Sequence, residues 1–136
     1  MPQMRRRAGL EYLEELIAFV AGHAETAGFP PSRIREIELA AEEALVNVFK
    51  YAYPETGGDV VVNCGLTDEG RLQLEISDRG IPFNMLHVPD PDLTADIPER
   101  RIGGLGIFFI KKMTDEARYQ RQGKTNNLTL IFDKRD

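Results

Sequence analysis

Two stretches in the N-terminal half of the chain have apolar residues every three or four positions. They cover residues 10 to about 27 and 33 to about 51. This period predicts two helices, each with one buried side. Gly28 and the Pro30-Pro31 pair separate the two helices, because glycine often ends a helix and proline cannot continue one. Ser32 is the expected N-cap of the second helix, since its hydroxyl can accept a hydrogen bond from the first turn.

Alternating apolar and polar residues follow a predicted turn at residues 54–58. The alternation predicts strands at residues 59–66 and 71–77, with Asp68-Glu69-Gly70 as the turn of a β-hairpin. A long irregular segment, a short helix at residues 104 to about 113 and a second hairpin complete the order. The strands of that hairpin are expected at residues 117–122 and 128–133. The order predicts an α+β fold, a two-layer α/β sandwich with helices covering one face of a mixed, mostly antiparallel sheet.

Length and charge narrow the class of protein. The chain has 136 residues, which suits one domain spanning residues 1–136. A net charge of −5 argues against a nucleic-acid partner. No apolar run approaches the ~20 residues of a membrane helix, so we expect no membrane partner. Cys64 is the only cysteine, which fits a reducing compartment and predicts a cytoplasmic protein.

The second predicted helix carries a constellation suited to phosphate chemistry. Glu43, Asn47 and Lys50 are spaced to lie along one side of it. Asparagine is a poor residue for a helix interior, so its place one turn after a glutamate needs a reason. The Asn47 amide oxygen can bind Mg²⁺, which prefers oxygen ligands. Glu43 can then act as a general base, and Lys50 can contact phosphate. For Glu43 alone, a solvated surface carboxylate is the simpler interpretation.

Asp78 and Gly80 lie where the second predicted strand ends. Taken alone, Asp78 is most simply a turn residue. Gly80, two residues on, permits a close approach of the backbone to a ligand. A carboxylate here can accept a hydrogen bond from the exocyclic amine of adenine, which guanine lacks at that position. The pair therefore indicates an adenine pocket.

A glycine-rich run precedes the third predicted helix and consists of Gly103, Gly104, Leu105 and Gly106. A flexible hinge is the simpler interpretation. Backbone N–H groups at a helix N-terminus, however, attract phosphate. The spacing is neither that of a Walker loop nor that of a dinucleotide-binding fingerprint.

Together the three motifs resemble a known family. Glu-x-x-x-Asn-x-x-Lys, then Asp-x-Gly, then Gly-Gly-x-Gly is similar to the ATP-binding domain shared by gyrase, histidine kinases and MutL, the Bergerat fold. Asp-Arg-Gly-Ile-Pro-Phe at 78–83 and the run at 103–115 most resemble the anti-sigma-factor serine kinases of bacterial partner-switching systems. The resemblance covers residues 9 to 134.

The resemblance implies a role for each motif. Glu43 would be the general base, Asn47 the magnesium ligand and Asp78 the adenine contact, with ATP and Mg²⁺ as cofactors. Gly80 would line the base pocket, residues 84–102 would form a lid, and residues 104–106 would hold phosphates. Thr129 would correspond to a threonine on the last strand that helps to bind adenine. An edge strand usually begins the fold, and only residues 2–8 remain for it here.

The implied function is an ATP-dependent serine/threonine-protein kinase. It would phosphorylate a STAS-domain antagonist and hold a sigma factor or another effector inactive, as a homodimer. Two alternatives stay open. One is an ATP-binding module that sequesters a partner without phosphotransfer. The other is an ATPase with a conformational cycle, which we rank last.

Overall fold

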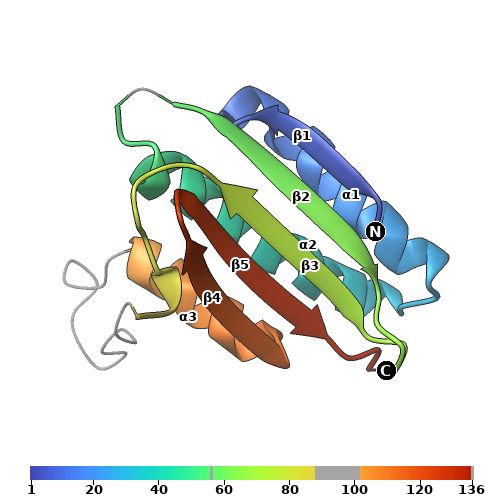
Figure 1. The fold of residues 1–136 in the computed structure, drawn as a ribbon. Helices are drawn as coiled ribbons and strands as arrows, with labels where there is room; N and C mark the ends of the chain where they lie inside the picture. The colour runs from blue at the N-terminus through green and yellow to red at the C-terminus, as the bar shows by residue number, and fades with distance from the viewer. Residues whose placement is uncertain (56, 88–101, 136) are drawn as a thin grey trace, which may run out of the picture.

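The computed structural model describes residues 1–55, 57–87 and 102–135, with the backbone alone for 102–105. Figure 1 shows the order of the elements along the chain. The strands and helices are β1 (Gln3–Arg7), α1 (Leu13–Thr26), α2 (Pro31–Asn47), β2 (Asp59–Leu66), β3 (Leu72–Asp78), α3 (Ile102–Met113), β4 (Glu116–Gln122) and β5 (Thr125–Phe132). Three short turns of helix join them: η1 (Leu10–Tyr12) and η3 (Met85–His87) are 3₁₀, and η2 (Val48–Ala52) is a π-helix that extends α2.

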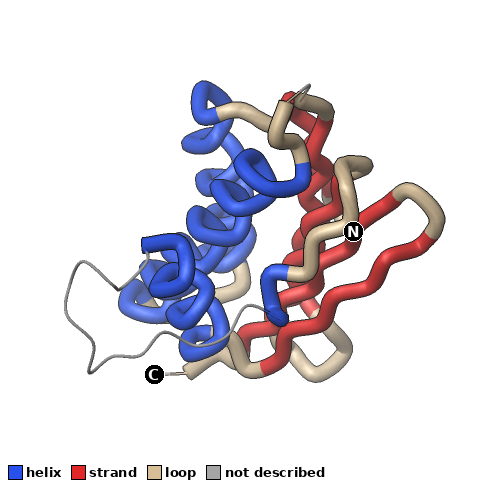
Figure 2. Tube along the Cα trace, turned by 90° about the vertical axis from the view of Figure 1, so that its left-hand side faces the viewer, coloured by secondary structure: helices blue, strands red, loops and turns tan. Residues whose placement is uncertain are grey.

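The strands form one antiparallel sheet in the order β1-β2-β3-β5-β4. The three α-helices lie together against one face of this sheet, which gives two layers (Figure 2). Helix α2 packs against both α1 and α3. The predicted α+β sandwich with helices on one face is therefore confirmed, although all the described strand pairs are antiparallel and the sheet is not mixed.

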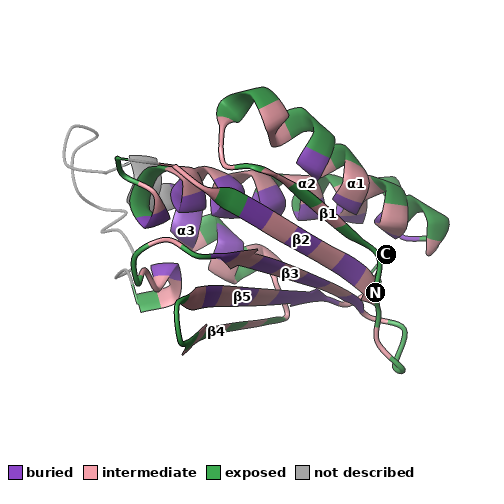
Figure 3. Cartoon of the chain, turned by 45° about the horizontal axis from the view of Figure 1, so that its top comes forward, coloured by how far each residue is buried: buried purple, intermediate pink, exposed green. Residues whose placement is uncertain are grey.

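The alternation along the central strands explains why the sheet has one buried face. In β3, Leu72, Leu74 and Ile76 are buried, whereas the residues between them are half-buried (Figure 3). The β2 partners of Leu74 and Ile76, Cys64 and Val62, lie directly opposite and are buried as well. Successive strand residues point to opposite faces. The buried set therefore faces the helices, and the other face carries polar residues.

Two predicted boundaries need correction, and one open question about an edge strand is answered. Ser32 is not the N-cap of α2: Pro30 holds that position and Pro31 is the first helical residue, where its missing N–H costs nothing. Strand β5 begins at Thr125, because the turn before it takes only two residues rather than five. Residues 2–8 do contain the edge strand, since β1 pairs with β2 from Gln3 to Arg7.

A buried arginine joins the helical layer to the last strand. Arg33 is 2% exposed. Its guanidinium donates to the Asp133 carbonyl at 2.9 Å, to the Met113 carbonyl at 2.8 Å and to Asp115 Oδ2 at 2.5 Å. These contacts tie the start of α2 to the end of α3 and to the chain just after β5. They fix the position of α3 relative to α2, which matters for the site below.

Candidate functional site

Glu43 of α2 faces helix α3. A Cβ at Gly106 would lie 2.1 Å from Glu43 Oε2, so only glycine leaves room for this carboxylate. The side chain is half-buried. Burial raises the pKa of the Glu43 carboxyl above its usual value; Glu42 raises it further and Lys50 lowers it. A partly desolvated carboxylate with a raised pKa is a suitable proton acceptor.

Asn47 lies one turn after Glu43 on the same side of α2 and is buried. Its Nδ2 donates to the Glu43 backbone carbonyl at 2.6 Å. Within the described residues, no hydrogen bond reaches its Oδ1. The amide group is therefore held with its nitrogen on the helix and its oxygen available, which is the orientation that a Mg²⁺ ligand requires.

Lys50 follows in the π-helical segment η2 and is exposed. The prediction placed it in line with Glu43 and Asn47 on one continuous α-helix. The change to a π-helix after Asn47 alters the angular position of Lys50, so α-helical spacing no longer places it. Its positive charge nevertheless lowers the pKa of Glu43, against the larger effect of burial. Single π-helical turns are frequent at functional sites.

Asp78 is the last residue of β3 and is buried on the helix-facing side of the sheet. Its Oδ1 accepts two hydrogen bonds, from Gly80 N at 2.9 Å and from Asn126 Nδ2 at 2.8 Å. Burial raises the pKa of the Asp78 carboxyl, while these two donors and the charge of Arg121 oppose the rise. No described residue donates to Oδ2. One carboxylate oxygen is therefore committed to the protein and the other is available for a ligand.

Gly80 makes its close approach to the protein itself. A Cβ at this position would lie 2.1 Å from the Ala52 carbonyl oxygen, and Ile81 N donates to the same oxygen at 2.8 Å. The Asp-Arg-Gly turn is thus fastened to the end of η2, five residues after Asn47. This contact, and the contact of Gly106 with Glu43, bring all three sequence motifs onto α2 and its π-helical extension.

Asn126 of β5 is a site residue that the sequence reasoning missed. It pairs directly with Asp78 across the strands and is buried. Thr129 was the expected residue of this strand, but it is three positions along and therefore faces the opposite side of the sheet. There it lies across from Glu75 and Arg118. The structure therefore does not bring Thr129 together with Asp78, and Asn126 takes that place.

The glycine run lies inside the first turn of α3, which begins at Ile102, two residues earlier than predicted. Gly103, Gly104 and Leu105 are thus in the turn whose backbone N–H groups lack partners within a helix. This is the location that phosphate binding requires. Gly106 differs from them, because its absent side chain admits Glu43. Of the predicted lid, residues 84–87 form the start and η3, and residues 88–101 lie outside the described residues.

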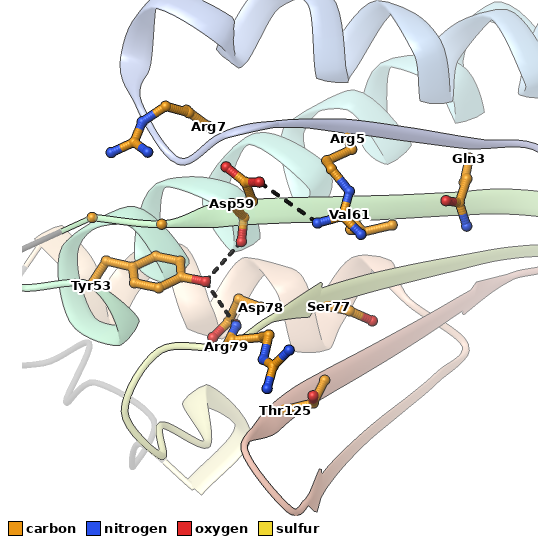
Figure 4. A pocket seen from close by; sticks show the side chains of 12 residues that line it. Gln3, Arg5, Arg7, Tyr53, Asp59, Val61, Ser77, Asp78, Arg79 and Thr125 are labelled. Carbon is orange, nitrogen blue, oxygen red and sulfur yellow. Dashed lines mark hydrogen bonds and ion pairs between the residues drawn. The ribbon is translucent and has the colours of Figure 1, made fainter.

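A cavity of about 590 Å³ opens at the same end of the sheet, on the side away from the helices (Figure 4). Its walls include Arg5, Arg79 and Tyr53, whose hydroxyl donates to the Asp59 carbonyl and accepts from Arg79 N. Of the predicted site residues, Asp78 alone borders it. Glu43 and Asn47 do not line this cavity, so we do not assign the nucleotide to it.

The arrangement fits a nucleotide with magnesium. Asp78 offers a carboxylate oxygen to a base with an exocyclic amine, and Asn47 offers an amide oxygen to a cation. The first turn of α3 offers backbone N–H groups to phosphates. Glu43 lies against Gly106 of α3 and one turn before Asn47, so it is next to both of these groups and can accept a proton there.

Comparisons with known proteins show the family of the chain. The family described as "Histidine kinase-like ATPase domain" matches residues 7–132. The serine-protein kinase RsbW of Listeria monocytogenes is 30% identical over 122 residues, which cover 85% of this chain and 77% of that protein. RsbW of Bacillus thuringiensis is 29% identical over 136 residues, covering 97% and 82%.

Solved structures share the fold. The SiaB-SiaC complex of Pseudomonas aeruginosa contains a chain with a TM-score of 0.73 at 13% identity, covering 97% of this chain and 89% of that one. A Mycobacterium tuberculosis protein with RsbU and RsbW domains has a TM-score of 0.65 at 18% identity, covering 97% and 32%. On the match of nearly its whole length, the chain belongs to the histidine kinase-like ATPase domain family and, within it, to the anti-sigma-factor serine kinases.

Proposed function

We propose that this protein is an ATP-dependent serine/threonine-protein kinase of a partner-switching system. It phosphorylates a STAS-domain antagonist and holds a sigma factor or another effector inactive. The kinase names of its relatives support the reaction class. The SiaB-SiaC neighbour was solved as a complex of two proteins, which is in keeping with a partner-binding role. We further propose that it acts as a homodimer in the cytoplasm.

The observation that carries the proposal is the position of Glu43. The carboxylate lies against Gly106 at the start of α3, one turn before Asn47, and its pKa is raised by burial. A site that only binds ATP has no need of a half-buried carboxylate next to the phosphate-binding turn, where its negative charge opposes that of the phosphates. A base that receives a proton during transfer explains the position.

Each residue then has one task. Asp78 accepts a hydrogen bond from the adenine amine, and the first turn of α3 donates to phosphate oxygens. Asn47 would hold the magnesium ion, which when bound neutralises phosphate charge. Glu43 accepts the proton of the substrate hydroxyl while the oxygen of that hydroxyl forms a bond to the terminal phosphorus of ATP. The bond from that phosphorus to the bridging oxygen breaks, and ADP leaves.

The alternative is an ATP-binding module that sequesters its partner without phosphotransfer. The kinase and the binding module differ only in what happens to the terminal phosphate of ATP, and the position of Glu43 favours the kinase. The test is incubation of the protein with γ-labelled ATP, Mg²⁺ and a STAS-domain partner that binds it. Label on a serine or threonine of the partner supports the kinase. A stable complex without transfer supports the binding module, and release of free phosphate alone would indicate an ATPase.

A further inference from the structure

A chain of hydrogen bonds crosses three strands and ends on Asp78. The Tyr119 hydroxyl of β4 donates to Asn126 Oδ1 of β5. Asn126 Nδ2 donates to Asp78 Oδ1 of β3 at 2.8 Å and to the Ile81 carbonyl at 2.9 Å. The chain lies on the helix-facing side of the sheet, where Asn126 and Asp78 are both buried. Every polar atom of the Asn126 amide is used.

The direction of this chain follows from the chemistry of its ends. The Asp78 carboxylate and the Ile81 carbonyl are both acceptors, so the amide must present its NH₂ group to them. Its oxygen must then face Tyr119, whose hydroxyl is the donor. With the amide reversed, its oxygen would face two other acceptors, and buried unpaired polar groups are costly. The two acceptors therefore set which way Asn126 points, and the Tyr119 hydroxyl donates to the remaining oxygen, which completes the hydrogen bonding of the amide in that orientation.

The fixed amide in turn fixes Asp78. Its Oδ1 is held by Asn126 and by Gly80 N, and Arg121, which donates to the Gly80 carbonyl at 2.8 Å, anchors the same turn. Hydrogen-bond donors to a carboxylate favour its charged, accepting form. The remaining oxygen, Oδ2, is thereby presented as an acceptor in one orientation. Such an acceptor suits an exocyclic amine and opposes a carbonyl oxygen.

We infer that Tyr119 and Asn126 are positioning residues that set the preference of this site for 6-amino purines over 6-oxo purines. The inference rests on the proposed ATP site and deepens it. Among the described contacts, Tyr119 is linked to Asp78 only through Asn126. Its effect on nucleotide binding would therefore be transmitted by the Asn126 side chain. A network that only stabilised the packing of β4 against β5 would contain the same hydrogen bonds. Its loss, however, would affect the binding of both kinds of purine alike.

The test compares ATP with inosine triphosphate, which carries an oxygen in place of the amine. Tyr119→Phe removes only the hydroxyl that donates to Asn126 Oδ1 and leaves this oxygen without its partner. Tyr12→Phe is the matched control, because the Tyr12 hydroxyl makes no hydrogen bond among the described residues. The dissociation constants of both nucleotides are measured by titration calorimetry with Mg²⁺ for the wild type and both variants.

The expected result is a loss of selectivity. In Tyr119→Phe, ATP affinity should fall by about 3- to 10-fold, the range for one neutral hydrogen bond, while inosine triphosphate affinity stays within about twofold. Tyr12→Phe should leave both constants unchanged. If Tyr119→Phe weakens the binding of both nucleotides equally, or of neither, these hydrogen bonds only stabilise the packing of the strands and the inference is wrong. If the wild type binds neither nucleotide, the proposed function itself fails.

A second variant separates a change in nucleotide selectivity from a loss of folding. Asn126→Ala removes the whole amide and should lower the ATP preference more than Tyr119→Phe does. Thermal unfolding is followed for each variant, and binding is measured well below the transition. A preference for ATP that survives in a folded Asn126→Ala protein would overturn the inference, whereas a preference lost in both variants supports it.

Discussion

The carboxylate of Glu43 and the α-carbon of Gly106 are in contact across helices α2 and α3: a Cβ at position 106 would lie 2.1 Å from Glu43 Oε2. The contact joins the first and third motifs of the sequence. It also explains the last glycine of Gly-Gly-Leu-Gly, which lies too far into α3 to offer an unpaired N–H. Glycine is required at position 106 because a side chain there would occupy the space of the Glu43 carboxylate, the proposed base.

Gly106→Ala should therefore impair phosphotransfer more than folding. The methyl group would meet the end of a flexible side chain, so Glu43 can move aside at little cost in stability. Displacing a reacting group by about 1 Å can cost on the order of 100-fold in rate. Gly22→Ala in α1 is the control, because nothing lies within 4 Å of its Cβ position. Transfer at the wild-type rate in Gly106→Ala would show that Glu43 need not occupy its observed position.

The pH dependence of phosphotransfer should report the surroundings of Glu43. A general base must be deprotonated, so the rate falls as pH drops through its pKa, which burial raises. Glu42→Gln removes a negative neighbour and should move this acid limb to lower pH. Lys50→Gln removes a positive neighbour and should move it to higher pH. Single-turnover transfer rates measured across the pH range test both variants. The role of Glu43 would be contradicted if the acid limbs of the two variants moved in the same direction or did not move.

Asn47 should be needed for the magnesium-dependent part of ATP binding. Asn47→Ala deletes the oxygen ligand, so its ATP affinity in Mg²⁺ should fall toward that of the wild type in EDTA. Asn63→Ala on the helix-free face of the sheet serves as the control, since Asn63 bonds to Gln3 far from α2. Calorimetry with and without Mg²⁺ gives the comparison. An unchanged response to Mg²⁺ in Asn47→Ala would remove Asn47 from the metal site.

Arg33 should matter for stability rather than chemistry. Arg33→Met leaves two partly buried carbonyls and Asp115 without their buried partner, which typically costs about 3–5 kcal/mol of unfolding free energy. Arg6→Met is the control, because the Arg6–Glu15 pair is exposed and such pairs contribute at most about 1 kcal/mol. Urea unfolding measures both variants. Equal effects of the two substitutions on the unfolding free energy would contradict the structural role of the Arg33 contacts.

The contact between Arg33 and Asp115 also predicts that stability depends on pH. Burial opposes ionisation of Asp115, but hydrogen bonds from Asp133 N and Arg135 and the charge of Arg33 outweigh it, so the pKa of Asp115 lies below its usual value. Its contribution to stability is thus present above the ordinary aspartate pKa and is lost as pH falls through the lowered one. In Arg33→Met this acid-induced loss should be smaller.

The periodicity of the chain predicted most of the fold because each element shows its own apolar pattern. The helix period in residues 10–27 and the alternation in 59–77 both follow from burying one side. Asn126 escaped notice for a local reason: it lies in a polar run, Gly123 to Asn127, that looks like a turn. Only the register of β5 with β3, which places it opposite Asp78, identifies it.

Other features depended on contacts between distant segments. The charge of Arg33 predicts exposure, yet the residue is buried because two distant segments, at residues 113–115 and at Asp133, supply acceptors for it. The requirement for glycine at position 80 comes from the Ala52 backbone, 28 positions earlier in the chain. No local pattern contains either relationship, whereas the Glu43–Asn47 spacing could be predicted because both residues lie on one helix.

Phosphotransfer by Glu43→Gln tests the central claim most directly. The substitution keeps the shape of the side chain and removes the proton acceptor, so transfer from γ-labelled ATP to a bound STAS-domain partner should slow by about 10²- to 10⁴-fold. ATP affinity should change little, because the base acts mainly in the transition state. The account predicts this separation of rate from affinity. Transfer by Glu43→Gln at the wild-type rate would contradict it.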